Sequence, residues 1–257
     1  MDYLSLWNTL AGCFPLLAAA RAKPPKAAPG VSGPGAGQRH PPINVFDFEA
    51  LARRRLSRMA FEYVDAGAGD EITLRRNREC LDGLRLQPRV LVGAEKIDTT
   101  VELFGERLAS PLLLAPCAYQ KVLHPEGELA TARAAAAAQT TMVVSTFATV
   151  SLEQIAGAAP ARRWFQLYVQ PDHGFTRELV QRAEAAGYQV LVITVDTPML
   201  GVRDRERRSG FRLPAGIERA NLKPLGKRLA RLGHFEGGGD YYLLDPAICW
   251  KTIDWIL

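Results

Sequence analysis

Polar side chains stand where four short apolar runs end in the middle of the chain. These ends supply small residues, hydroxyls, an amide, a phenol and a carboxylate, at Ala115 to Tyr119, Ser145 to Phe147, Gln166, Tyr168, Thr194 and Asp196. Such a set suits a flat, hydrogen-bonding heterocycle laid against small side chains, with a polar substrate above it. The pattern therefore indicates a site for an organic ligand.

Each of these residues also has a purely structural explanation. Gln166 and Tyr168 alternate along one run and face the same side, where a buried, satisfied polar pair is as well supported as a ligand site. Thr194 suits packing as a β-branched residue, and Asp196, placed before Thr-Pro, suits an Asx-type turn. Tyr63 taken alone indicates a core position. No single motif decides between the two explanations.

Other common kinds of site have no support. Neither the GxGxxG nor the GxxxxGK[ST] pattern occurs, so a Rossmann or P-loop nucleotide site lacks its motif. The four cysteines lie far apart without a CxxC pair, which argues against a zinc site or disulfide framework and indicates a reducing, cytoplasmic compartment. His124, in "HPEGE", is expected in a loop or at a helix start. We expect no metal.

The elements that must position these residues alternate along the chain. Apolar runs at 111–115, 141–146, 163–169 and 189–196 alternate with helical patterns at 126–138, 151–160, 175–186 and 245–257. Such alternation predicts right-handed βαβ units and a parallel sheet, with functional residues at the carboxyl ends of the strands. The last helix is expected to have Pro246 near its first turn.

The part of the chain before these units is less regular. We expect a helix from Phe48 to Tyr63 capped by Asp47, a polar, glycine-containing stretch at 66–77 and a short strand pair between 99 and 110. Residues 21–42 hold six Pro, four Gly and four Ala, so residues 1–43 are predicted to be a disordered extension and linker.

Two signals bear on location. "LAGC", ending at Cys13, has the form of a lipoprotein cleavage box, but no Lys or Arg precedes it, so a lipoprotein signal is not expected. The net charge of +5 is concentrated between Arg203 and Arg231, where the local charge is +7 and the rest of the chain sums to −2. The body of the protein is therefore not expected to bind nucleic acid.

Seven phrases, in order from about Asn44 to the last residue, resemble the FMN-dependent 2-hydroxy acid dehydrogenase/oxidase family, which includes glycolate oxidase and L-lactate dehydrogenases. Among them are "YVDAGAGDEITLRRN", "APCAYQKVLHPEGELATARAAAAA", "RWFQLYVQ" and "AGYQVLVITVDTPMLG". The resemblance implies a TIM-type (β/α)8 barrel and FMN as the cofactor. It also implies oxidation of an L-2-hydroxy acid to a 2-oxo acid by hydride transfer to flavin.

The resemblance assigns roles to matching positions. The flavin-binding positions are Pro116, Cys117, Ala118, Ser145, Gln166 and Thr194. Tyr63 and Tyr168 match tyrosines that hold the substrate carboxylate or hydroxyl, and Phe147 matches a residue that lines the substrate pocket. Asp196 matches the partner of a catalytic histidine, and Arg203 matches an arginine at the substrate carboxylate. The other arginines of this cluster are predicted to form a solvated face. Cys117 and Phe147 depart from the family, which commonly has Thr and Trp or Tyr there.

The resemblance also makes predictions about the extent of the chain. Residues 44–257 match the N-terminal half of the barrel, an N-terminal helical segment and about four of eight β/α units, truncated before the fifth strand. The family's Lys, His base and phosphate-binding loops are not matched, so the 257-residue chain alone is predicted to be inactive. The alternative is a non-catalytic half-barrel that acts as a binding or interaction module through its exposed strand edges.

The expected partners follow from these two hypotheses. The enzyme hypothesis predicts a small 2-hydroxy acid substrate and oxygen, a quinone or a cytochrome as the electron acceptor. Either hypothesis predicts a homo-oligomer or a complementing C-terminal half. The segment 203–231 is expected to be a mobile basic loop over the flavin-facing end, with peripheral membrane contact as one possible role and a solvated loop as the other.

Overall fold

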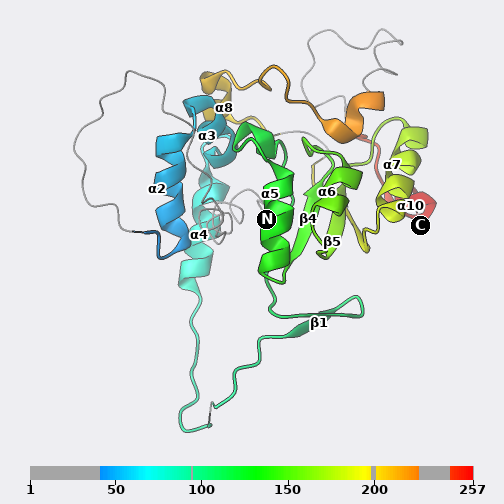
Figure 1. Cartoon of the computed structure of the whole chain (residues 1–257). Helices are drawn as coiled ribbons and strands as arrows, with labels where there is room; N and C mark the ends of the chain where they lie inside the picture. The colour runs from blue at the N-terminus through cyan, green and yellow to red at the C-terminus, as the bar shows by residue number, and fades with distance from the viewer. Residues whose placement is uncertain (1–40, 94, 198–200, 226–243, 257) are drawn as a thin grey trace.

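The structure is a computed structural model that describes residues 41–93, 95–197, 201–225 and 244–256 (Figure 1). Most of the predicted disordered extension, residues 1–40, lies outside the described residues, and so does Cys13. Within the described residues no helix is both long enough and apolar enough to span a membrane.

Two helices, and not one, open the described chain. Helix α2 (Val45–Arg55) is capped by the Asn44 side chain, which accepts the N–H groups of Phe46 and Asp47. The predicted Asp47 cap is therefore wrong. Extended backbone at Leu56 and Ser57 separates α2 from α3 (Arg58–Asp65), whose N-cap is Ser57. Only α3 has buried side chains, among them Phe61 and Tyr63.

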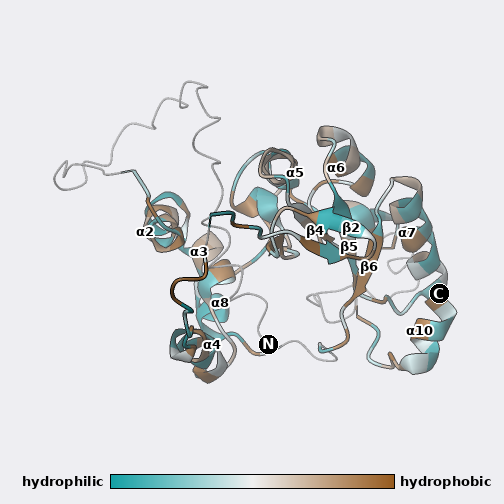
Figure 2. Cartoon of the chain, turned by 90° about the horizontal axis from the view of Figure 1, so that it is seen from below, coloured by the Kyte–Doolittle hydropathy of each residue, from teal (hydrophilic) through white to brown (hydrophobic). Residues whose placement is uncertain are grey.

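Helix α4 (Ile72–Gly83) occupies part of the stretch for which the sequence predicted no element. Glu71 precedes it in the left-handed region at φ 58° and gives no side-chain cap, so the usual start signal is absent. The predicted strand pair is confirmed as an antiparallel hairpin of β1 (Val101–Leu103) and β2 (Glu106–Leu108). Figure 2 shows β2 close to the ends of β4 and β5. Phe104 at the turn meets the ring edge of Trp164 at 5.4 Å.

A four-stranded parallel sheet forms the centre of the molecule. Its strands are β3 (Leu113–Leu114), β4 (Thr141–Ser145), β5 (Arg163–Leu167) and β6 (Val190–Ile193), side by side in chain order. Helices α5 (Glu128–Ala137), α6 (Leu152–Ala158) and α7 (His173–Ala185) alternate with them and lie along one side of the sheet (Figures 1 and 2). The predicted alternation and parallel sheet are confirmed.

Apolar packing between the sheet and these helices makes the core. Met142 and Val144 of β4 and Phe165 and Leu167 of β5 are almost completely buried, in one cluster with Ile155 of α6. Burial of each such side chain contributes about 1.5–3 kcal/mol relative to exposure. Because side chains alternate along a strand, this core leaves the residues between them for the other face.

The remaining elements follow the last strand along the chain. Helix α8 (Asp204–Ser209) and the short 3-10 helix η3 (Ala220–Leu222) lie within the segment predicted to be a loop. Helix α10 (Trp250–Ile256) confirms the final helix, although it begins after Pro246 and not around it. In Figure 1, α3 and α8 lie together at the upper left, to one side of the sheet and beyond α5.

Candidate active site at the carboxyl ends of the strands

A hydrogen-bonded row of side chains crosses three strands where they end. Gln166 Nε2 donates to Thr194 Oγ1 at 2.8 Å, and Gln166 Oε1 accepts from Ser145 Oγ at 3.3 Å. The backbone N–H of Thr146 donates to the same oxygen at 3.2 Å. Ser145 and Gln166 are partners in the β4–β5 register, so the row follows from the sheet itself. We name Ser145, Gln166 and Thr194 the amide row.

The polar pair proposed as the structural alternative has different partners. Gln166 is only 2% exposed and internally hydrogen-bonded, as that alternative required, but these bonds do not involve Tyr168. The Thr146 hydroxyl instead joins the two strands, donating to the Gln166 carbonyl at 2.7 Å and accepting from the Tyr168 N–H at 3.0 Å. An amide group has two N–H donors, and Gln166 uses one of them for Thr194. Gln166 can therefore form its hydrogen bonds within the protein and still donate one to a ligand.

Small residues follow β3 beside the amide row. Pro116 and Ala118 are half-buried, and Cys117 is buried with its Sγ 3.5 Å from the Ala118 carbonyl oxygen. Burial raises the pKa of the Cys117 thiol far above its ordinary value, so the thiol stays neutral. These three small residues form an uncharged surface without long side chains.

Glu128 is a site-supporting residue that the sequence analysis missed. Its carboxylate is fully buried at the start of α5. It accepts from Thr149 through the backbone N–H at 2.8 Å and the hydroxyl at 2.6 Å, and from the Gln120 N–H at 3.3 Å. The side chain therefore ties the loop after β3 to the loop after β4. A carboxylate in a first helical turn is normally assigned to the helix dipole, which hid this role.

Five aromatic rings form a continuous array that includes residues following β3, β4 and β5. Tyr168 stacks on Phe147 at 5.1 Å, and Phe147 stacks on Tyr119 at 6.0 Å. Tyr119 meets Tyr63 at 5.7 Å, and Tyr63 stacks on Phe211 at 4.2 Å. The structure thus brings Tyr63, Phe147 and Tyr168 together as candidate site residues. It adds Tyr119, which the sequence placed at the end of the first strand without a role, and Phe211, which had no sequence signal beyond being aromatic.

The two candidate tyrosines are held in the protonated form. Burial raises the pKa of Tyr63 well above its ordinary value. Burial also raises the pKa of Tyr168, and the nearby negative charge of Asp196 adds to the effect. Both phenols therefore keep their O–H at neutral pH and are available as hydrogen-bond donors.

Two arginines lie against the aromatic array. The Arg203 guanidinium lies over the Tyr63 ring at 5.2 Å, donates to the Tyr63 carbonyl at 3.1 Å and forms an ion pair with Glu206. Arg219 lies 5.4 Å from the Tyr119 ring centre, and its Nε donates to the Tyr119 hydroxyl at 2.8 Å. Positive charge over rings suits a small anion. Arg219 was not among the predicted site residues.

Asp196 stands exposed at the end of β6, beside these groups. Its Oδ1 accepts from the Thr197 hydroxyl at 3.2 Å. Among the described histidines, His124 accepts from the Glu126 N–H and His173 pairs with Asp245, so neither is a partner of Asp196. His124 is confirmed as a residue before a helix. The role of Asp196 beside a base stays a prediction.

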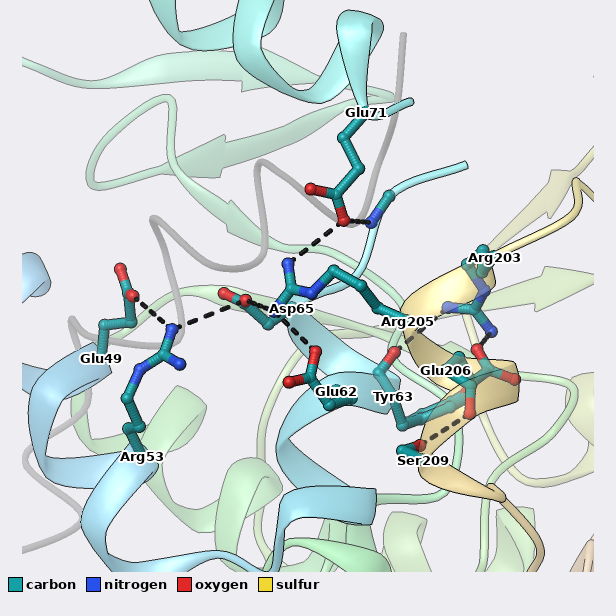
Figure 3. Close-up of polar contacts among 11 residues, drawn as sticks. Glu49, Arg53, Glu62, Tyr63, Asp65, Glu71, Arg203, Arg205, Glu206 and Ser209 are labelled. Carbon is teal, nitrogen blue, oxygen red and sulfur yellow. Dashed lines mark hydrogen bonds and ion pairs between the residues drawn. The ribbon is translucent and has the colours of Figure 1, made fainter. Parts of the chain in front are cut away.

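The prediction of a solvated face for the remaining arginines is wrong for Arg205. Its guanidinium lies among Glu62, Asp65 and Glu71 at 2.6, 2.5 and 3.1 Å (Figure 3). Helix α8, which carries Arg205 and follows Arg203, packs against α3 and replaces part of the predicted loop. The sequence did not indicate this because the acidic partners lie in a distant segment.

The membrane-contact prediction loses part of its basis. Leu222 and Leu225 are buried in the core, at 4% and 0% exposure, and cannot insert into a bilayer. Residues 226–231 lie outside the described residues. In the described part of the chain, no group of three or more His, Cys, Asp or Glu is arranged to hold a metal ion.

Comparisons with known proteins decide the family. Residues 52–257 match the family model described as FMN-dependent dehydrogenase. The chain belongs to this family. The resemblance predicted from the sequence and the α/β fold class of the family barrel are thereby confirmed.

Individual relatives agree with the family model. The chain is 47% identical over 222 residues to an L-lactate oxidase of Nostoc sp., which covers 84% of this chain and 61% of the relative. It is 40% identical over 220 residues to glycolate oxidase 1 of Zea mays, covering 83% and 58%. The solved structure of a mandelate oxidase superposes with a TM-score of 0.71 at 38% identity, covering 82% of this chain and 57% of that chain. The chain thus spans 58–61% of the length of these two curated relatives.

Proposed function

We propose that this chain supplies the flavin-facing and carboxylate-binding part of an FMN-dependent site that oxidises a small L-2-hydroxy acid to a 2-oxo acid. The observation that carries the proposal is the amide row at one sheet end, together with the array of Tyr63, Phe147, Tyr168 and Arg203. The names of the relatives, L-lactate oxidase and glycolate oxidase, support the substrate class.

The residues present fit FMN by their hydrogen-bonding chemistry. An amide and two hydroxyls in line offer alternating donors and acceptors to the edge of a planar heterocycle, and the surface at Pro116, Cys117 and Ala118 is low enough for a ring to lie against. These residues with Ser145, Gln166 and Thr194 would hold the group. Bound FMN would supply the acceptor for the hydride from the substrate α-carbon.

The other site residues would bind and orient the substrate. Tyr63 and Tyr168, kept protonated, donate hydrogen bonds to its carboxylate or hydroxyl, and Phe147 limits the entry of water. Arg203 attracts the carboxylate, which must compete with Glu206 for the guanidinium. Asp196 stabilises the positive charge of a base that has taken the hydroxyl proton, as its counterpart does for the family's histidine.

The reaction can be tested in a fusion of residues 1–257 to the carboxyl-terminal part of the Nostoc L-lactate oxidase. We expect the purified fusion to carry FMN and to lose flavin absorbance when L-lactate or glycolate is added without oxygen. Asp196→Asn should keep the flavin and slow its reduction by roughly 100-fold or more, the usual contribution of general-base assistance. A folded, FMN-loaded fusion that keeps its absorbance with every small L-2-hydroxy acid would contradict the proposal.

The remaining partner assignments belong to the same proposal. We infer oxygen as the electron acceptor, because the relatives are oxidases, and hydrogen peroxide formation by the fusion tests it against a quinone or cytochrome. A cytoplasmic location and a homo-oligomer are proposed with it. Peripheral membrane contact through 203–231 would now rest on basic charge, which flotation with anionic and neutral liposomes tests.

An interaction module is the second candidate, and a specific surface favours it. Between α4 and the hairpin the chain exposes large apolar side chains at Leu84, Leu86, Val90, Leu91, Val92 and Ile97. Exposed apolar residues gathered in one segment mark a docking surface. FMN binding by the fusion distinguishes the two, because both predict association. A fusion that associates with rising concentration in light scattering but binds no FMN favours the module.

A further inference from the structure

The contact between α3 and α8 decides where Arg203 lies. Arg203, just before α8, reaches the Tyr63 carbonyl and ring, while Phe211, just after α8, stacks on the same ring. Tyr63 therefore contacts residues at both ends of α8, Arg203 before the helix and Phe211 after it. Any shift of α8 relative to α3 would separate Arg203 from Tyr63.

Among the residues that the structure describes, one backbone–backbone hydrogen bond joins the segment after α3 to the segment before α8. The Gly69 N–H donates to the Val202 carbonyl at 2.8 Å, next to a close approach of Gly201 to Ala68. A Cβ at Gly201 would lie 3.1 Å from the Ala68 Cβ, so a larger residue at this end of the contact would crowd Ala68. One backbone hydrogen bond leaves the rotation of a six-residue helix undetermined.

Arg205 supplies an attachment from within α8 itself, beside those that Arg203 and Phe211 make just before and just after the helix. Nη2 hydrogen-bonds to Asp65 Oδ2 at 2.5 Å, and Nη1 hydrogen-bonds to Glu71 Oε1 at 3.1 Å. Nη2 also lies 2.6 Å from Glu62 Oε2, an ion pair without hydrogen-bond alignment. Figure 3 shows the guanidinium pointing between these carboxylates from a different helix. We name Arg205 and these three carboxylates the acidic clamp.

The chemistry of the clamp requires an arginine. The carboxylate side chains are 14%, 17% and 22% exposed, and they come from the body of α3, its last residue and the N-cap of α4. A planar guanidinium presents several N–H groups in a fixed plane, whereas an ammonium is a point charge. Burial alone would lower the pKa of Arg205, but the hydrogen bond and charge of Asp65, followed by Glu71 and Glu62, raise it above its ordinary value.

Other cations do not replace Arg205 in the clamp. Arg53 reaches only Asp65, at 3.7 Å, and is shared with Glu49 (Figure 3). Arg207 and Arg208 on the same helix are exposed. Without Arg205, three carboxylates at the α3–α8 contact would repel one another in a partly buried place.

We propose that Arg205 is a positioning residue: the acidic clamp fixes α8 against α3 so that Arg203 lies on Tyr63. Its consequence for substrate, a pre-placed guanidinium for the carboxylate, rests on the proposed function. Arg205 itself points into the clamp (Figure 3), so it acts through Arg203.

Hydrogen exchange of the full chain tests the position of α8 directly. Arg205→Gln should speed exchange of the amides of 203–211 by about tenfold or more, the factor for losing a hydrogen bond to a charged group, and leave those of β4 and β5 unchanged. Arg208→Gln removes the same charge from the exposed side of the same helix and should change exchange less than about twofold. Arg205→Lys keeps the positive charge but loses the planar set of N–H donors, so its amide exchange rates should fall between those of the two Gln variants.

Glycolate affinity, measured by calorimetry on the same samples, tests the consequence. Arg205→Gln should weaken it by about tenfold while Arg208→Gln leaves it within about twofold. The proposal is overturned if the amides of 203–211 exchange at the same rate in Arg205→Gln and Arg208→Gln. It is also overturned if Arg205→Lys matches the wild type in both amide exchange and glycolate affinity. If the wild type binds no glycolate but the exchange pattern holds, Arg205 keeps its positioning role and the proposed function fails.

Discussion

The amide row and the acidic clamp position the two sides of one site by different physics. The row joins residues 21 and 28 positions apart, on neighbouring strands in register, and its two hydrogen-bonded members on β4 and β5 are nearly fully buried. The clamp joins residues 134 and 140 positions apart by ion pairs whose side chains are 14–32% exposed.

This difference separates what is fixed in the site from what is adjustable. Strand register sets the spacing of the row, so its geometry changes only if the sheet changes. Partly exposed ion pairs respond to salt, pH and single substitutions. Under the proposed function, the flavin side of the site would be rigid and the carboxylate side adjustable.

The fixed side should be damaged most by Glu128→Ala. Its three accepted hydrogen bonds hold the loops that follow β3 and β4, and their buried donors would lose their partner. We expect a loss of about 3 kcal/mol in the free energy of unfolding, measured by urea titration. Glu184→Ala, an exposed glutamate on α7, is the matched control and should cost less than about 0.5 kcal/mol. Equal losses of unfolding free energy in the two variants would show that Glu128 does not hold these loops.

Gln166→Leu should have the next largest effect, because it breaks the row without changing the volume greatly. The Thr146 N–H and the hydroxyls of Ser145 and Thr194 lose their partner, at a cost of about 2 kcal/mol in the free energy of unfolding. Gln181→Leu, on the exposed face of α7, serves as the control. A variant as stable as the control would show that the row is not what orders the strand ends.

These two residues also show what the sequence could and could not predict. Ser145, Gln166 and Thr194 were identified because alternation along short apolar runs places them at strand ends. Glu128 was missed because its donors, Gln120 and Thr149, lie in two segments, one after β3 and one after β4, whose paths depend on the sheet. The local sequence pattern predicts which face of a strand a residue lies on. It does not predict the burial of a carboxylate whose hydrogen-bond donors are distant in the sequence.

The clamp was less predictable still. Arg205 was assigned to solvent because a run of charges usually is exposed, and its partners Asp65 and Glu71 lie more than 130 positions earlier. Tyr119 adopts φ 57°, a left-handed conformation uncommon for a bulky residue, which no propensity indicates. Helix α4 was missed because Gly67, Gly69 and Asp70 dominate the local signal of a turn.

The adjustable side should be sensitive to salt, with an intermediate effect. Asp65→Asn removes the 2.5 Å partner of Arg205 and should cost about 1 kcal/mol at low salt, in the range of partly exposed ion pairs. The difference from wild type should shrink as salt is raised toward 1 M, where the screening length is about 3 Å. The loss in Gln166→Leu should not change with salt. The same salt dependence in both variants would remove the distinction between row and clamp.

The smallest expected effect concerns an ion pair outside the site. Arg182 hydrogen-bonds to Glu153 at 2.9 Å, between α7 and α6, and lowers the pKa of this carboxyl below its ordinary value of 4.5. A lowered pKa in the folded state stabilises the fold above the unfolded pKa, and this stabilisation is lost as pH falls through the folded pKa. Arg182→Gln should therefore cost less than about 1 kcal/mol at pH 7 and almost nothing well below pH 4. A cost that grows on acidification would contradict this.

FMN affinity of the fusion protein tests the central claim, that the amide row binds the flavin, most directly. Wild type, Gln166→Leu and Gln181→Leu should be stripped of flavin, and the fluorescence of added FMN followed to equilibrium. The account predicts that Gln166→Leu binds FMN at least tenfold more weakly than the other two, which should agree within about twofold. Equal FMN affinity in all three folded proteins would contradict the assignment of the flavin to the row.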